Sequence, residues 1–126
     1  MWLTEEQFQQ FKLTLKIIKM DLPIILKNLL QAQENFDSVS YSECFSDDAL
    51  VFDEGKTHKG KEEIKKWNEK TNEEYKTKLE VIDVFNEDKM TVLTTRGSGT
   101  FDGSPIILKY KFEIENDKIS SLKITS

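Results

Sequence analysis

An aspartate at the end of a predicted strand is the strongest candidate for chemistry in this sequence. The run ALVFD, Ala49–Asp53, is typical of a strand and stops at the turn signal Glu54-Gly55. If Val51 faces the core, the period of two places Asp53 on the same side, at the end of the strand. Desolvation at the edge of an apolar pocket raises the pKa of a carboxyl group, which suits it to proton transfer. The alternative is that Asp53 orders the turn that follows it.

His58 lies shortly after Asp53 and is the only histidine in the chain. Histidine is the side chain that titrates nearest to neutral pH, so the two residues could form an acid–base pair. The alternative is a partly exposed loop histidine without a role in catalysis.

Three aromatic residues are candidates for ligand contacts. Trp67 combines an apolar body with an N–H donor, so it could line a pocket and donate to a ligand, or fill the core. Tyr110 and Phe112 lie on the inward side of an alternating strand, where they could face either core or cavity.

Cysteine and histidine, the usual zinc ligands, occur once each in the chain. One cysteine, Cys44, excludes an intramolecular disulfide and any multi-cysteine metal site, and it is most simply a buried filler. One histidine leaves a zinc site short of nitrogen ligands unless carboxylates supply the rest. We therefore expect neither a metal nor a cofactor, and a reducing compartment.

The charge balance excludes two classes of partner. Eighteen basic and twenty-three acidic residues give a net charge of −5, which argues against general binding to nucleic acid or to an anionic membrane. The N-terminus carries two glutamates where a secretory signal has positive charge, and no stretch approaches the roughly 20 apolar residues of a membrane span. We expect a cytoplasmic protein of one domain.

The sequence pattern predicts mainly helices in the first half of the chain. Thr4 and Gln7 form a capping-box pattern, and the three- and four-residue spacing of Phe8, Phe11, Leu15, Ile18 and Leu22 predicts a helix over residues 5–19 with one apolar stripe. The alternative for FKLTLKI, residues 11–17, is a strand, because this run also alternates.

Three further helices follow in the sequence. Asp21 is expected to cap a largely buried helix with Pro23 in its first turn. Asp37 is expected to cap a short helix that ends near Ser46, and Gly60 precedes a helix that carries Ile64 and Trp67 on one face.

From Tyr75 onward the pattern changes to strands joined by short turns. ILKYKFEI, residues 107–114, alternates apolar with charged residues, which predicts one face on a core. Short connections imply antiparallel pairs, and the whole predicts an α+β fold with helices on one face of an antiparallel sheet. A two-residue turn at Asp102-Gly103 would place Arg96 opposite Lys109 on the outer face, which we favour; a longer turn would bring Arg96 inside.

Two motifs carry a family resemblance. FSDDALVFDEGKTHKGKEEIKKW, Phe45 to Trp67, resembles the central signature of the SnoaL-like branch of the nuclear transport factor 2-like superfamily. GTFDGSPIILKYKF, Gly99 to Phe112, resembles a hairpin of the same branch. The resemblance covers about Leu22 to Thr125, so we expect an N-terminal helical extension over residues 1–20 and the family domain over residues 21–126.

The resemblance implies a cone-shaped, cystatin-like α+β fold, in which a curved antiparallel sheet wraps around the N-terminal helices and leaves an apolar pocket. It also places Asp53 where ketosteroid isomerases have their proton-abstracting aspartate, after the matching Asp47-Asp48-Ala49 run. The isomerase's oxyanion-donating tyrosine falls at Leu29, which cannot donate, and its second acid falls near Tyr110, which can. Steroid isomerisation is therefore not expected, whereas another enolisation or aldol step remains open.

The resulting expectation is a protein that binds a small apolar organic molecule. As an enzyme it would be a metal-free isomerase, cyclase or dehydratase with Asp53 as base, His58 as its partner, and Leu29, Trp67, Tyr110 and Phe112 around the ligand. The alternative is a non-catalytic protein-association module of the same fold. We also expect a homodimer, because one face of the sheet is left free by the helices.

Overall fold

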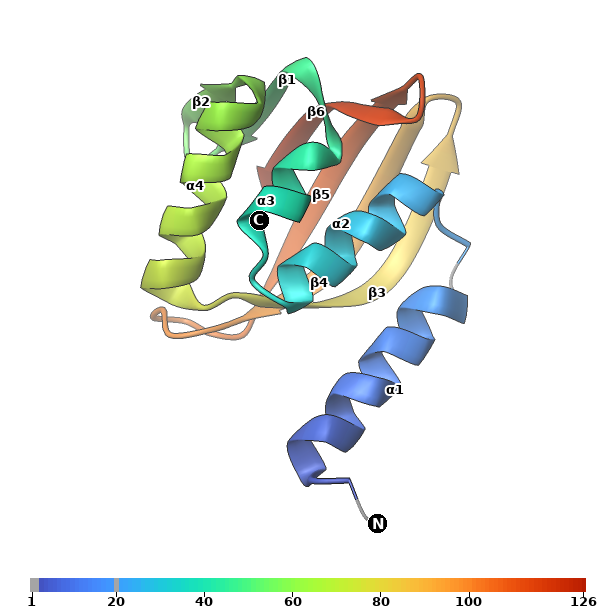
Figure 1. Cartoon of the computed structure of the whole chain (residues 1–126), viewed down its shortest axis with the longest axis vertical. Coiled ribbons are helices and arrows are strands. Elements are labelled where there is room, and N and C mark those ends of the chain that lie inside the picture. The colour runs from blue at the N-terminus through green and yellow to red at the C-terminus, as the bar shows by residue number, and fades with distance from the viewer. Residues whose placement is uncertain (1–2, 20) are drawn as a thin grey trace.

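Three helices lie over one face of a six-stranded sheet, and a fourth helix leads away from this body (Figure 1). The computed structural model describes residues 3–19 and 21–126, and the side chains of residues 13–19 lie outside this description. The helices are α1 (Glu5–Lys19), α2 (Ile24–Glu34), α3 (Ser38–Glu43) and α4 (Gly60–Tyr75). The strands are β1 (Phe45–Asp53), β2 (Lys56–Lys59), β3 (Lys78–Glu87), β4 (Met90–Ser98), β5 (Ile106–Glu115) and β6 (Lys118–Thr125).

The strand order in the sheet is β2-β1-β6-β5-β4-β3. Strands that follow each other through a short turn pair antiparallel, as their connections predict: β1 with β2, and β3 through β6 in series. β1 and β6 pair in parallel, because the chain passes through α4 and a long meander before it returns to β1. The fold is α+β, as predicted, and its sheet is mixed.

The alternating pattern of β5 produces the expected division between core and solvent. Tyr110 and Phe112 are buried, whereas Lys109, Lys111 and Glu113 between and beside them are exposed. The inward face of the sheet thus continues the apolar surface that α2 and α4 present. Burial of this surface is the main favourable term for the fold.

The predicted N-terminal helix is confirmed with both of its capping hydrogen bonds. The backbone N–H of Gln7 donates to Thr4 Oγ1 over 3.1 Å, and the backbone N–H of Thr4 donates to Gln7 Oε1 over 3.0 Å. Phe8 and Phe11 are 46% and 57% exposed, and Lys12 Nζ lies 4.9 Å from the centre of the Phe8 ring. Leu15 and Ile18, the rest of the stripe on α1, lie outside the described side chains.

Two predicted helix boundaries are wrong. α2 begins at Ile24 with Pro23 as its N-cap, so Asp21 lies outside the helix and does not cap it. α3 ends at Glu43 and not near Ser46, because Phe45 already pairs with Ile119 of β6 and the Ile119 amide donates to the Cys44 carbonyl. Asp37 does cap α3, and its side chain accepts from the Ser40 amide over 3.1 Å.

Arg96 lies on the outer face, as favoured from the sequence, although the register differs. The connection between β4 and β5 is longer than two residues, and Arg96 pairs with Ile107 while Thr94 takes the place opposite Lys109. The Arg96 guanidinium reaches across to Glu80 of β3 at 2.6 Å.

No helix among the described residues is long and apolar enough to cross a membrane.

Candidate functional site

A cavity of about 770 Å³ opens between α4, the β1–β2 turn and the strands β5 and β6. This volume lies within the range of about 300–1,000 Å³ that small-molecule sites occupy. Its wall is made of polar and apolar side chains in similar measure, and the lining residues used below are Gln33, Tyr41, Asp53, His58, Trp67, Asn68 and Tyr110. Glu54, Lys56, Lys70 and Glu74 place charges of both signs around it.

Asp53 ends β1 at the wall of the cavity and is partly buried. The β1–β2 connection is a two-residue turn in which Glu54 and Gly55 have φ values of 51° and 74°, so the strand stops abruptly after the carboxylate. Trp67 Nε1 donates to Asp53 Oδ2 over 3.3 Å. Burial raises the pKa of Asp53 above its ordinary value, and the Trp67 hydrogen bond partly offsets this rise.

Trp67 is the residue that connects the aromatic wall to the carboxylate. Its ring lies stacked on His58, with centroids 5.7 Å apart, and tilted against Tyr41, with centroids 6.1 Å apart. α4 supplies Trp67, and β2, an element the sequence did not predict, supplies His58 opposite Val51. The tryptophan therefore packs on two rings of the wall and holds the orientation of Asp53 with its N–H.

Two tyrosines from different elements complete this wall. Tyr110 of β5 was a predicted site residue; Tyr41 of α3 was not. They are 7% and 2% exposed, and burial raises the pKa of each, with a further increase from the negative charge of Asp53. One signal could have revealed Tyr41: with Cys44 and Phe45 it forms an i, i+3, i+4 apolar set that must face inward.

Leu29 and Phe112 pack in the core and do not line the cavity. Leu29, 2% exposed, lies on the buried face of α2, and the cavity begins one turn later at Gln33. Phe112 is fully buried, because its partners in the neighbouring strands, Thr91 and Leu122, are themselves buried and close the space around it. The structure thus brings together Asp53, His58, Trp67 and Tyr110, and leaves these two out.

The rim of the cavity is built from the end of α4 and the connection between β4 and β5. The Thr100 amide donates to the Tyr75 carbonyl over 2.8 Å, and the rings of Tyr75 and Phe101 meet edge to face at 5.9 Å. A Cβ on Gly99 would lie 2.2 Å from the Tyr75 carbonyl oxygen, so only glycine permits this approach.

Within residues 3–19 and 21–126, no group of three or more histidine, cysteine, aspartate or glutamate side chains is arranged to hold a metal ion. Cys44 is a free, buried thiol whose pKa burial raises to about 11. The groups at the cavity that can take part in proton transfer or hydrogen bonding include the Asp53 carboxylate, the phenols of Tyr41 and Tyr110, the His58 imidazole and the Trp67 indole.

Comparison with solved structures identifies the family. A proposed polyketide cyclase from Sinorhizobium meliloti is similar with a TM-score of 0.82 and 32% identity, over 84% of this chain and 97% of its own. The chain belongs to the SnoaL-like branch of the nuclear transport factor 2-like superfamily. No protein-family model and no curated protein matches this SnoaL-like chain.

Two more distant structures share the fold of this SnoaL-like protein. A cystatin-fold protein from Novosphingobium aromaticivorans has a TM-score of 0.71 and 20% identity, over 85% of this chain and 99% of its own. A protein with a ketosteroid isomerase-like fold from Catenulispora acidiphila, in complex with trimethylamine, has a TM-score of 0.74 and 16% identity, over 82% and 85% of the two chains. At these identities the likeness concerns the fold alone, so the chemistry must be argued from the residues of the site.

Proposed function

We propose that this SnoaL-like protein binds a small, mainly apolar organic molecule and moves a proton on it, as a metal-free isomerase, cyclase or dehydratase. The observation that carries the proposal is the Asp53 carboxylate, which is half-buried in the cavity wall and held by the Trp67 N–H. Its raised pKa brings the carboxylate closer to the basicity that proton abstraction requires.

The reaction class follows from the groups that surround Asp53. The carboxylate accepts a proton from a carbon next to a carbonyl group, the C–H electron pair forms a C=C bond, and the carbonyl oxygen takes the negative charge. The proton then returns to another carbon, or the new enolate attacks a second carbonyl carbon. His58, when protonated, stabilises the ionised form of Asp53 and so tunes its basicity.

The experiment compares Asp53→Asn with wild type for exchange of α-protons against deuterium in a panel of cyclic ketones and β-diketones, followed by proton NMR. Loss of a general base typically lowers the rate by about 10²–10⁴-fold. The matched control is Asp83→Asn, which removes a carboxylate from the exposed surface of β3 and should leave the exchange unchanged.

A second measurement separates catalysis from structure. If Asp53 orders the Glu54-Gly55 turn instead, Asp53→Asn should lower the free energy of unfolding by about 0.5–2 kcal/mol, as lost caps do. Such a drop, together with unchanged ligand affinity by Trp67 fluorescence in a Trp2→Phe background, contradicts the catalytic role.

The alternative function, a protein-association module, is favoured by the apolar surface outside the cavity. Leu3, Phe8 and Phe11 of the N-terminal segment are exposed, and so are Phe52, Ile82, Phe85 and Ile107 of the sheet. We propose that residues 1–20 form an extension that covers exposed apolar side chains of the sheet in a homodimer. Light scattering should give twice the protomer mass, and deletion of residues 1–20 should weaken the dimer; a monomer at tens of micromolar would contradict it.

A further inference from the structure

Two elements line the cavity over much of their length and give it the shape of a slot. β5 contributes Tyr110, Leu108 and Ile106, which take alternate positions and so share the inward face of the strand. The rise of a strand places Ile106 about 13 Å from Tyr110. α4 contributes Trp67 and Tyr75, which the rise of an α-helix places about 12 Å apart. Two walls of nearly equal length therefore bound an elongated space, which we call the slot.

The two ends of the slot differ in chemistry. At one end Trp67 donates to the Asp53 carboxylate, and the charge of Asp53 contributes to raising the pKa of Tyr110. At the other end the rings of Tyr75 and Phe101 meet edge to face, with centroids 5.9 Å apart. The carboxylate and this aromatic pair therefore lie at opposite ends of both walls.

The end with the aromatic pair is closed by the connection between β4 and β5. This connection carries Phe101 and leads into β5 at Ile106. The Thr100 backbone N–H donates to the Tyr75 carbonyl over 2.8 Å, and Thr100 Oγ1 donates to the Glu74 carbonyl over 3.1 Å. Hydrogen bonds to two consecutive carbonyls therefore hold Phe101 against the end of α4.

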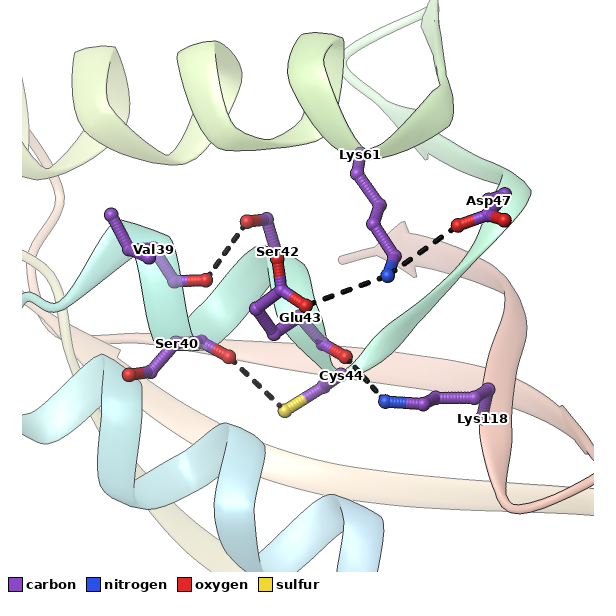
Figure 2. Close-up of polar contacts among 8 residues, drawn as sticks. All are labelled: Val39, Ser40, Ser42, Glu43, Cys44, Asp47, Lys61 and Lys118. Atoms are coloured by element: carbon purple, nitrogen blue, oxygen red, sulfur yellow. Dashed lines mark hydrogen bonds and ion pairs between the residues drawn. The ribbon is translucent and has the colours of Figure 1, made fainter.

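α4 is also held at its other end. Figure 2 shows Lys61 Nζ of α4 at 3.5 Å from both the Glu43 carboxylate of α3 and the Asp47 carboxylate of β1. At the same place Lys118 Nζ of β6 donates to the Glu43 carbonyl over 2.8 Å (Figure 2). Contacts at its start and the Thr100 hydrogen bonds at its end thus hold the helix, and a wall that is held at both ends gives the slot a defined length.

Between its two ends the slot is lined by branched, non-aromatic side chains on both walls. Leu108 lies halfway along the β5 wall, and Thr71 lies halfway along the α4 wall. Neither side chain has a flat ring on which a ligand could stack, so this part favours an alkyl chain through burial of its apolar surface. Each methylene group that is buried there raises the affinity by about fourfold.

We propose that the slot binds an elongated carbonyl compound, whose carbonyl group lies beside Asp53 and whose unbranched alkyl tail extends to Phe101. The Tyr75–Phe101 pair ends the slot and limits the length of the tail. This inference deepens the proposed function and rests on it for the position of the carbonyl group. It makes Phe101 the residue that decides which homologues bind.

The test measures the affinity of wild type for 2-alkanones of increasing chain length by isothermal titration calorimetry. We expect the affinity to rise by about fourfold per methylene until the tail reaches Phe101, and then to stop rising. Phe101→Ala should move this break to longer tails, because it removes the ring that ends the slot. The second homologue beyond the wild-type break should then bind about 10- to 20-fold more tightly to Phe101→Ala than to wild type.

Two further variants show whether the effect belongs to the slot. Phe36→Ala makes the same chemical change on an exposed ring outside the cavity and should leave the break at the wild-type length. Phe101→Trp enlarges the ring at the end of the slot and should move the break to shorter tails. If Phe101→Ala does not fold, the shift in Phe101→Trp decides the test.

The outcomes distinguish this inference from the proposed function. A break at the same length in wild type and in the Phe101 variants, an affinity that rises without a break, or no binding of any homologue overturns the slot. A break that moves with Phe101, combined with unchanged proton exchange in Asp53→Asn, supports the slot and rejects Asp53 as the base. Loss of exchange in Asp53→Asn without any break supports the base and rejects the slot.

Discussion

Two polar clusters, one buried and one partly buried, lie side by side in this protein and differ in how their hydrogen bonds are used. The amide cluster, formed by Gln33, Ser38, Asn68 and Asn72, joins α2, α3 and α4. The cavity cluster is formed by Tyr41, Asp53, His58, Trp67 and Tyr110. Gln33 and Asn68 also line the cavity, so the two clusters share a wall.

In the amide cluster each side chain satisfies another. Gln33 Nε2 donates to Asn72 Oδ1 and to the Thr77 carbonyl, both over 2.9 Å, and Asn68 Nδ2 donates to Gln33 Oε1 over 3.0 Å. In the cavity cluster one hydrogen bond joins two of the described side chains, from Trp67 to Asp53 over 3.3 Å, and the Asp53 carboxylate also accepts from the backbone N–H of Glu54. The hydrogen bonds of the amide cluster join three helices to one another, whereas the cavity cluster has donors and an acceptor that can bind another molecule.

The largest expected effect comes from breaking the amide cluster. Asn68→Ala leaves Gln33 Oε1, Ser38 Oγ and Asn72 Nδ2 without this partner, and we expect a loss of about 3 kcal/mol in the free energy of unfolding. Urea denaturation measures it. The matched control is Asn28→Ala on the exposed face of α2, which should change stability by less than about 0.5 kcal/mol. Similar losses of unfolding free energy in both variants would mean that the amide cluster contributes no more to stability than an exposed asparagine does.

A smaller effect is expected from the pH dependence of the cavity cluster. Because the pKa of Asp53 is raised by folding, the native state holds this proton to higher pH than the unfolded chain. The contribution of Asp53 to stability therefore falls as pH rises from the ordinary pKa value of 3.8 through the raised value, and Asp53→Asn lacks this loss.

The measurement is the melting temperature of both proteins from below pH 3.8 to neutral pH. Asp53→Asn should gain about 1–4 °C on wild type across this window and keep a constant advantage above it. Asp83→Asn, on the exposed surface, controls for the loss of one negative charge. If the difference in melting temperature between Asp53→Asn and wild type narrowed with rising pH, the fold would instead stabilise the ionised carboxylate.

The smallest expected effect is on stability when Tyr41 loses its hydroxyl. Because the hydroxyl has no partner among the described residues, Tyr41→Phe should change the free energy of unfolding by less than about 0.5 kcal/mol. The contrast with Asn68→Ala, measured by the same denaturation, is the sharpest form of the comparison. A loss above about 1 kcal/mol would mean that the Tyr41 hydroxyl contributes to stability, as the side chains of the amide cluster do.

Local patterns in the sequence determined most of the elements. The capping box at Thr4 and Gln7, the cap at Asp37 and the alternation around Tyr110 each depend on neighbours in the chain, and each is present in the structure. Period two also placed Val51 and Asp53 correctly: Val51 is fully buried, and Asp53 reaches the cavity wall. These are short-range properties of the backbone, so residue type and spacing suffice to predict them.

Only the tertiary structure decided where the core ends and the cavity begins. Phe112 and Tyr110 share one face of β5, yet Phe112 is enclosed by Thr91 and Leu122 of the neighbouring strands, while Tyr110 meets open space. Likewise, Tyr41 joins Trp67 and Asp53 because α3, α4 and β1 pack together, which no spacing within α3 encodes. A cavity is space that no side chain fills, and which space remains unfilled depends on contacts between residues far apart in the chain.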